Sequence, residues 1–161
     1  MISEEFDGLD ISILRELRNN CKIHMRKLAE TLHSHPNTIM QRIKKLEKSG
    51  VIKGYQARIN YELLGFGCNA MIMVKISKEA RKDWGILKEL KHLPEINNVF
   101  AITGDYDLLL IARTTDNAEL RELLKRIDKI PYIERTQTSN ILEEIKTGYE
   151  FNPLEEIPTD R

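Results

Sequence analysis

Apolar residues recur every three or four positions through the first fifty residues, which is the spacing of amphipathic helices. One stripe predicts a helix that starts near Asp7, a favourable N-cap, and stops at 19–20. A second, shorter stripe covers 25–32 and is followed by a turn at 33–35. Pro36 opens a third helix, since proline at the first helical position loses no needed N–H, and Gly50 ends it. The pattern therefore predicts three helices.

The pattern changes after Gly50. Residues 51–60 are β-prone and are interrupted by Gly54, which predicts a small hairpin, or wing, followed by a strand. Residues 61–67 contain two glycines and are interpreted as a linker. We therefore predict that residues 1–60 form a winged helix-turn-helix domain.

Strand and helix patterns alternate through the rest of the chain. One helical stripe holds Trp84 and Leu90 and is ended by Pro94, and the second covers 120–127. They lie between four predicted strands at 70–76, 96–103, 108–114 and 133–141. The order β-α-β-β-α-β predicts an α+β ferredoxin-like sandwich over 68–146, with both helices on one face of the sheet. Residues 147–161 are expected to form a loosely held acidic tail.

The charge is unevenly distributed although the net charge is zero. Residues 1–60 hold 11 Lys and Arg against 7 Asp and Glu, and the remainder is acidic by the same margin. Most of the basic excess follows Pro36. A polyanionic partner for the N-terminal third is plausible on this basis, although a solvated helix face is the better explanation of the charge taken alone.

The third predicted helix would be the recognition helix of a helix-turn-helix, the helix that presents its side chains to the major groove of DNA. Its basic residues would then contact DNA directly. On the polar face of the third predicted helix and its flank, the candidates for base readout are Asn37, Thr38, Gln41 and Arg42. The candidates for phosphate contacts are Lys44, Lys45, Lys48, Lys53 and Arg58. The alternative is a purely structural three-helix module.

Two segments of the second domain are unusually polar. Gly104, Asp105, Tyr106 and Asp107 form a hairpin-sized connection that needs no role beyond the turn. Asp105 and Asp107 could act as an acid and base pair, but no nucleophile, metal-ligand set or phosphate loop accompanies them. Residues 135–140 of the last strand contain no apolar side chain, so this strand is an exposed edge, a subunit interface or a wall for a polar ligand.

The chain resembles the Lrp/AsnC, or feast/famine, transcriptional regulators of bacteria and archaea. The resemblance covers 7 to about 145 and rests on Gly50-Val-Ile-Lys-Gly-Tyr55 paired with Gly104-Asp-Tyr-Asp107. It implies double-stranded DNA as partner, self-association as dimers that often assemble into octamers, and an amino acid as effector. The effector site it implies borders Gly104, Asp105, Tyr106 and Asp107, and Thr136 and Thr138 of the last strand are added as candidates. The turn before the recognition helix has His33 and His35 where the family commonly has Gly and a capping Ser or Thr.

Several other classes are not expected. No apolar run approaches the roughly 20 residues that span a bilayer, the N-terminus is unlike a signal peptide, and a cytoplasmic protein is predicted. Cys21 and Cys68 have no partners at metal spacing, so neither a metal nor another cofactor is predicted, and no catalytic residue is assigned.

The predicted function is a sequence-specific DNA-binding regulator that senses an amino acid. The alternatives are an architectural DNA-binding protein without an effector and, less favoured, a small-metabolite enzyme.

Overall fold

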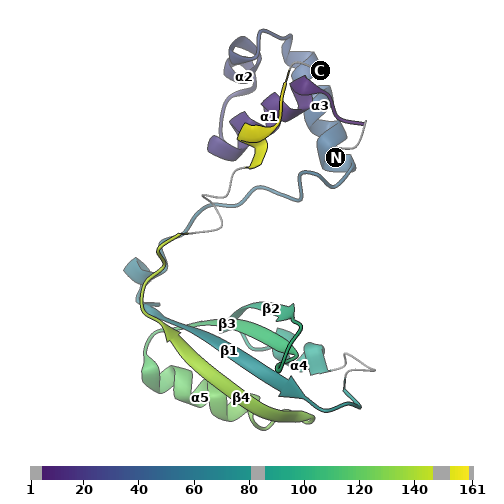
Figure 1. Cartoon of the computed structure of the whole chain (residues 1–161). Coiled ribbons are helices and arrows are strands. Elements are labelled where there is room, and N and C mark those ends of the chain that lie inside the picture. Colours follow the sequence, from purple (N-terminus) through teal and green to yellow (C-terminus); the bar gives the residue numbers. More distant parts are fainter. Residues whose placement is uncertain (1–4, 81–85, 147–152, 160–161) are drawn as a thin grey trace. The chain divides into compact units, whose positions relative to one another are not determined.

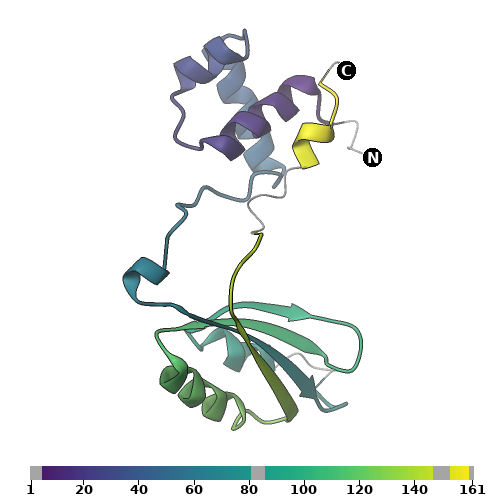
Figure 2. The same cartoon turned by 60° about the vertical axis from the view of Figure 1, so that its left-hand side comes forward.

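The computed structural model describes residues 5–80, 86–146 and 153–159. The chain forms two compact units (Figures 1 and 2). The first, here called the helical unit, combines Met1–Arg58 with Lys146–Arg161, and the second, the sheet unit, is Ile59–Ile145. Each unit has its own apolar core.

The helical unit contains the three predicted helices, α1 (Gly8–Asn19), α2 (Met25–Thr31) and α3 (Pro36–Lys48). Asp7 caps α1 through a capping box in which Asp7 and Asp10 each accept a hydrogen bond from the other's backbone N–H. The apolar stripes of the three helices meet in a core of Ile13, Leu28, Ala29, Ile39, Ile43 and Leu46. The predicted helix starts and stops are confirmed to within a residue or two.

The turn between α2 and α3 uses its two histidines in place of glycine and a hydroxyl cap. His33 adopts a positive φ of 47°, in the left-handed region that favours glycine. His35 is the N-cap of α3, and its Nδ1 accepts a hydrogen bond from Asn37 N at 3.3 Å. An imidazole thus supplies the cap that Ser or Thr usually provides.

The wing is not formed as predicted. Residues 51–60 contain neither a hairpin nor a strand, and most of their side chains are exposed. Ile52 N donates to Leu46 O and the Tyr55 hydroxyl donates to Glu47, which tie the start of this segment to α3. Gly54 at φ +152° interrupts the run, and the described residues place no neighbouring strand where it could pair.

The sheet unit confirms the β-α-β-β-α-β order. Its elements are β1 (Cys68–Ile76), α4 (Ile86–Lys91), β2 (Ile96–Ala101), β3 (Leu108–Thr114), α5 (Asn117–Ile127) and β4 (Ile133–Ile141). The four strands are antiparallel in the order β2-β3-β1-β4. Trp84, predicted on the first helix of this unit, lies outside the described residues. The segment leading into β1 holds a short 3-10 turn, η1 (Glu62–Leu64).

The two faces of the sheet differ because side chains alternate along each strand. Alternate residues of β1 and β3 are fully buried with Leu90 of α4 and Leu120, Leu123 and Ile127 of α5, so both helices cover the same face. The other face, here called the open face, carries Met71, Met73, Leu109 and Ile111, all only half-buried.

The described part of the C-terminal tail differs from the loosely held segment that we predict. It forms a short 3-10 turn, η2 (Pro153–Glu156), that packs on α1. The Arg15 guanidinium donates to the carbonyls of Leu154 at 2.8 Å and Ile157 at 2.5 Å. Gly8 lies against the backbone of Thr159, where any larger side chain would clash. In the described parts of the chain, no helix is long and apolar enough to cross a membrane.

Candidate DNA-binding surface and ligand site

The polar face of α3 is the candidate DNA-binding surface. Asn37, Gln41, Lys44 and Lys48 are exposed on it, and Thr38 is half-buried. The opposite stripe of Ile39, Ile43 and Leu46 is buried in the core. The helix therefore presents amide and ammonium groups to solvent from a rigid, well-packed base.

The side chains of Arg42 and Lys45 form ion pairs with acidic residues at the start of α1. Arg42 Nη1 lies 2.7 Å from Asp7 Oδ2 and 3.2 Å from Asp10 Oδ2, and Lys45 Nζ lies 3.2 Å from the same Asp10 oxygen. Lys45 also lies 5.0 Å from the centre of the Phe6 ring. The Asp10 side chain is fully buried, so its carboxylate holds α1 against α3 through two cations.

The charges in this cluster stabilise one another. Burial opposes ionisation of Asp7, but the Asp10 N–H and the Arg42 guanidinium outweigh it and lower the pKa of Asp7. Burial likewise opposes the charge of Arg42, and the carboxylates of Asp10 and Asp7 raise its pKa. Arg42 and Lys45 therefore have a structural role between the helices, whichever further contacts they make.

The two remaining cationic candidates, Lys53 and Arg58, lie beyond α3. Both are exposed in the extended segment 51–60. A cationic side chain on an extended segment has a wide reach, which suits a phosphate contact better than base readout.

The 104–107 loop joins β2 to β3 and is tied to β1 by one of its acids. Gly104 has a φ of +114°, a backbone conformation that glycine adopts readily because it has no Cβ. Asp107 Oδ2 accepts a hydrogen bond from Ile76 N at 3.0 Å and lies 3.5 Å from Lys75 Nζ. Asp107 thus anchors the loop, while Asp105 is exposed.

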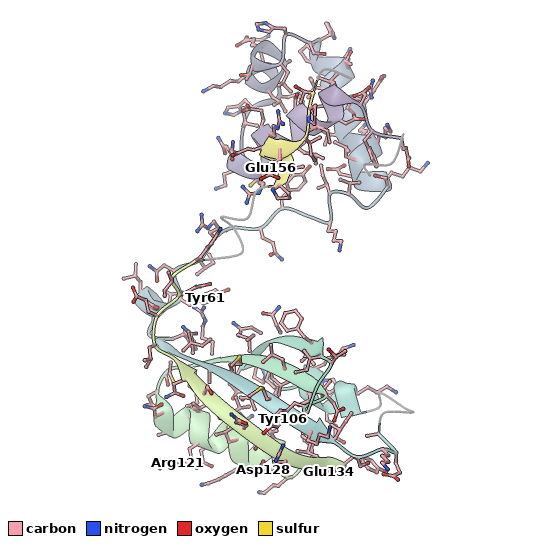
Figure 3. The ribbon with its side chains drawn as sticks, in the orientation of Figure 1. Tyr61, Tyr106, Arg121, Asp128, Glu134 and Glu156 are labelled. Carbon is pink, nitrogen blue, oxygen red and sulfur yellow. The ribbon has the colours of Figure 1, made fainter. Side chains whose placement is uncertain are left out.

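Tyr106 connects this loop to β4 (Figure 3). Its hydroxyl donates to Gln137 Oε1 at 2.7 Å, and the Arg135 guanidinium lies 4.8 Å from the centre of its ring. The structure therefore brings the loop together with Arg135 and Gln137, which we did not select from the sequence. The period of two along a strand puts Arg135 and Gln137 on one face of β4, but it puts Thr136 and Thr138 together on the other face in the same way, so it does not indicate which pair meets the loop.

Thr136 and Thr138 lie on the other face of the sheet. They pair with Val74 and Ile72, whose side chains are buried in the core. Thr136 Oγ1 donates to Asp128 Oδ1 just beyond α5 at 3.3 Å. The loop and these two threonines are therefore not brought together.

No cluster suited to a metal is present among the described side chains. No group of three His, Cys, Asp or Glu residues converges there, and Cys21 and Cys68 are free thiols. The remaining side-chain chemistry of the two candidate sites is that of hydrogen bonding and ion pairing.

Family models match both units. The Lrp/AsnC ligand binding domain matches 69–151, and a winged helix-turn-helix DNA-binding domain matches 6–53. The second match supports the winged helix-turn-helix class although the wing segment forms no hairpin in this structure.

Curated relatives extend over nearly the whole chain. The HTH-type transcriptional regulator FL11 of Pyrococcus horikoshii is 37% identical over 145 residues, which are 90% of this chain and 95% of that protein. The leucine-responsive regulatory protein of Haemophilus influenzae is 35% identical over 149 residues, with 89% and 88% covered.

Solved structures share the fold of the whole chain. A transcriptional regulator from Neisseria meningitidis, solved as a complex with L-Met, has a TM-score of 0.84 and 31% identity and covers 94% of this chain and 99% of its own. AsnC of Escherichia coli has a TM-score of 0.82 and 26% identity, with 88% and 95% covered.

Proposed function

Because the chain belongs to the Lrp/AsnC family of transcriptional regulators, we propose that it reads specific DNA sequences with α3 and senses an amino acid with the sheet unit. Its general role is that of a DNA-binding transcription regulator with a ligand-binding domain. The observation that supports sequence reading most directly is the exposed amide and ammonium face of α3, fixed in place by the buried Asp10.

The proposed roles on DNA divide by side-chain chemistry. Asn37, Thr38 and Gln41 lie in the first turns of α3 and would contact base edges, while Lys44, Lys48, Lys53 and Arg58 would contact phosphates. Arg42 and Lys45 are the sequence-predicted candidates for a base and a phosphate contact, and we propose that their main role is to hold α3 on α1.

The experiment separates base from phosphate contacts. Sites selected by the full-length protein are compared with those of Gln41→Ala and Lys44→Ala, with Arg121→Ala on the sheet unit as the control. We expect Gln41→Ala to relax preference at one base position and Lys44→Ala to weaken all sites alike and to reduce the salt dependence of binding. Identical effects of both substitutions on sequence preference would refute this assignment of roles.

Self-association is proposed through the open face of the sheet. Met71, Met73, Leu109 and Ile111 lie there half-buried, and neither α4 nor α5 covers them. A second copy of the chain would remove this apolar surface from water and give a dimer, with octamers as a further stage of assembly. Ile111→Lys should therefore lower the mass measured by light scattering, whereas Arg121→Ala should not.

Amino-acid sensing is proposed at the loop and the neighbouring face of β4. Asp105, Tyr106, Arg135 and Gln137 supply groups for both charged ends of a zwitterion. The Neisseria meningitidis relative was solved with L-Met, which supports this class of ligand.

Calorimetry of the full-length protein against the twenty amino acids tests the sensing site. Gln137→Ala should weaken binding, while Thr138→Val, on the opposite face of the same strand, serves as the matched control. Equal binding by both variants would exclude this site. An architectural protein without an effector would bind no amino acid at all.

A further inference from the structure

The C-terminal tail occupies a face of α1 that points away from the helical core. The turn η2 lies beside α1 in both views of the chain (Figures 1 and 2). Gly8, Ile11 and Arg15 share one face of α1, because they are spaced three and four residues apart. Ile11 lies about 200° around the helix from the core residue Ile13, and among the described residues it is not part of the helical core. Only 5% of Ile11 is nevertheless exposed, so we attribute its burial to the tail.

The tail presents a short turn with one apolar side to this face of α1. Leu154 and Ile157 are half-buried, while the two residues between them are exposed. Pro153 begins the 3-10 turn and Pro158 follows it, and proline is favoured both at the start of a helical turn and just beyond its end. The tail therefore docks as a defined turn.

Arg15 holds this turn through its backbone. The guanidinium donates to three carbonyls of the tail, those of Leu154 at 2.8 Å, Glu155 at 3.3 Å and Ile157 at 2.5 Å. Carbonyl groups at the end of a helical turn have no partner within the turn, so a cation placed there satisfies them. Arg15 therefore recognises the shape of the turn.

Gly8 gives the tail the space to approach α1. Its φ is not in the left-handed region, so backbone conformation does not explain a glycine in the first turn of α1, where alanine would favour the helix. A Cβ at Gly8 would overlap the carbonyl group of Thr159. At none of the other described glycines would a Cβ meet another atom within 4 Å. The close approach of the tail is therefore the reason for a glycine at this position.

The tail meets α1 at the turn that holds α3. Gly8 lies between Asp7 and Asp10, whose carboxylates both pair with Arg42 of α3. Asp10 also pairs with Lys45. The end turns of a helix open most easily, so a contact that fixes Gly8 also keeps these two carboxylates in place.

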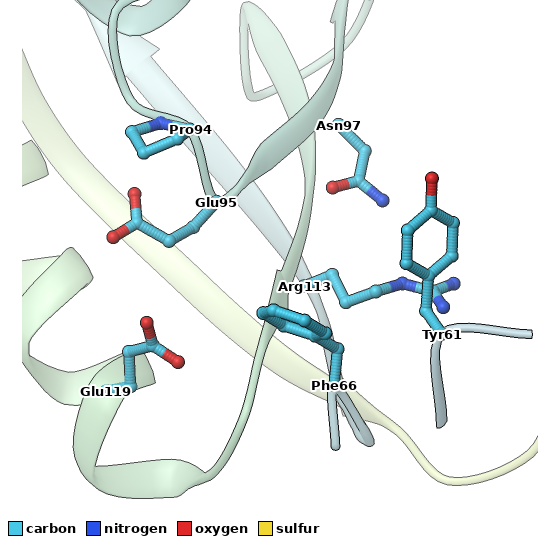
Figure 4. Close-up of a pocket in the computed structure, with 7 residues that line it drawn as sticks. All are labelled: Tyr61, Phe66, Pro94, Glu95, Asn97, Arg113 and Glu119. Atoms are coloured by element: carbon cyan, nitrogen blue, oxygen red, sulfur yellow. The ribbon is translucent and has the colours of Figure 1, made fainter. Parts of the chain in front are cut away.

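The other connection between the two units is attached elsewhere. The guanidinium of Arg113 lies 4.9 Å from the centre of the Tyr61 ring, beside a pocket of the sheet unit (Figure 4). Arg113 belongs to β3, so this contact fixes the segment before β1 to the sheet unit. Of the two attachments, only the tail reaches the first turn of α1.

We propose that the docked tail positions α3 for base readout by bracing the first turn of α1. This inference rests on the proposed reading of DNA bases by α3. Specific contacts require side chains placed within about 0.5 Å, whereas long lysine side chains can follow a phosphate. Loss of the brace should therefore reduce sequence discrimination and leave phosphate-dependent binding in place.

The test compares the affinity of the protein for its selected DNA site with its affinity for a scrambled duplex, at a temperature where circular dichroism shows every variant folded. The variants are Gly8→Ala, Arg15→Ala and removal of residues 153–161. Glu156→Gln, exposed on η2, is the control. We expect each of the three variants to lower the ratio of the two affinities by about fivefold to tenfold, the lower end of the effect of one mismatched base pair. Glu156→Gln should leave the ratio unchanged.

The charges of the variants separate a brace from an electrostatic effect of the tail. Removal of 153–161 takes away three acids and one arginine, which should strengthen binding to the scrambled duplex. Arg15→Ala removes a cation and should weaken that binding, while Gly8→Ala changes no charge. A brace predicts the same fall in discrimination in all three variants. Opposite changes in discrimination for the truncation and Arg15→Ala would overturn it.

A double variant tests whether Gly8 acts through the tail. Once residues 153–161 are removed, Gly8→Ala should have no further effect on the ratio, because it acts by displacing the tail. An equal effect with and without the tail would refute the brace. Unchanged discrimination in all three variants would refute it too, while leaving sequence reading by α3 intact. A wild-type protein that binds both duplexes equally would refute sequence reading and this inference with it.

Discussion

At the scale of single residues, the buried carboxylate of Asp10 has the largest structural effect in the helical unit. It joins the capping box of α1 and accepts charge-assisted hydrogen bonds from Arg42 and Lys45. The sequence pattern predicts Asp7 as a cap and Arg42 on the flank of the DNA face. It does not predict Asp10, because a polar residue in the first turn of a helix is ordinarily exposed.

Asp10→Ala should destabilise the helical unit by about 2 kcal/mol, because half of the capping box and two charged hydrogen bonds are lost together. The freed cations are one-third exposed and regain water, which keeps the loss below that of a fully buried pair. Urea unfolding followed by circular dichroism measures it. Glu30→Ala, exposed on α2, should change stability by less than about 0.5 kcal/mol, and an equal loss there would contradict the explanation.

Tyr55 provides a prediction at alkaline pH. Burial, together with its hydrogen bond to the Glu47 carboxylate, raises the pKa of Tyr55 from 10.0 to about 12. A raised folded-state pKa contributes stability that is complete below pH 10 and is lost as the pH rises through 12. The phenolate absorbance of the wild type minus that of Tyr55→Phe should therefore titrate near 12. In Glu47→Gln it should move toward 10, and no movement would rule out the carboxylate as a cause.

At the scale of elements, the apolar pattern was enough to predict the two helices of the sheet unit and its inner strands β1 and β3, because each of these buries one face in a shared core. The position of β4 residues relative to the loop was not predictable in the same way. Thr136 and Thr138 are as polar as Arg135 and Gln137, so polarity alone does not indicate which pair faces the loop. The prediction of a hairpin in 51–60 was wrong for a related reason: a segment with high β propensity forms a strand only where a neighbouring strand can pair with it, and none lies there in the described structure.

Two neighbouring residues of α5 should differ strongly in how much their substitution destabilises the sheet unit. Leu123→Ala should cost about 2–4 kcal/mol, since its side chain is fully buried between α5 and the sheet and the space it leaves cannot collapse completely. Glu122→Ala, one position earlier on the exposed side, should cost less than about 0.5 kcal/mol. Thermal unfolding of both variants measures the contrast, and similar losses would contradict the assigned helix face.

At the scale of the whole molecule, the N-terminal domain extends farther than its sequence limits suggest. The predicted domain ends at residue 60, but the compact unit adds Lys146–Arg161 to Met1–Arg58. Acidic and proline-containing tails usually have too little apolar surface to predict docking. Here Arg15 provides the attachment through backbone carbonyls, which carry no signature in the sequence of the tail.

Removing residues 153–161 should therefore destabilise the helical unit by about 1–2 kcal/mol, through loss of the hydrogen bonds from Arg15 and the packing of η2 on α1. Arg15→Ala should produce most of the same loss. Combining the two changes should cause little further destabilisation, because both remove the same hydrogen bonds between Arg15 and the tail. Urea unfolding of the four proteins measures this coupling, and fully additive losses would show that Arg15 does not hold the tail.

The docked tail also makes the sheet unit an insertion within the helical unit. The chain passes between the units twice, after Arg58 and after Ile145, so the sheet unit is tethered at both of its ends. A protease cut at either crossing alone would leave the units linked through the other.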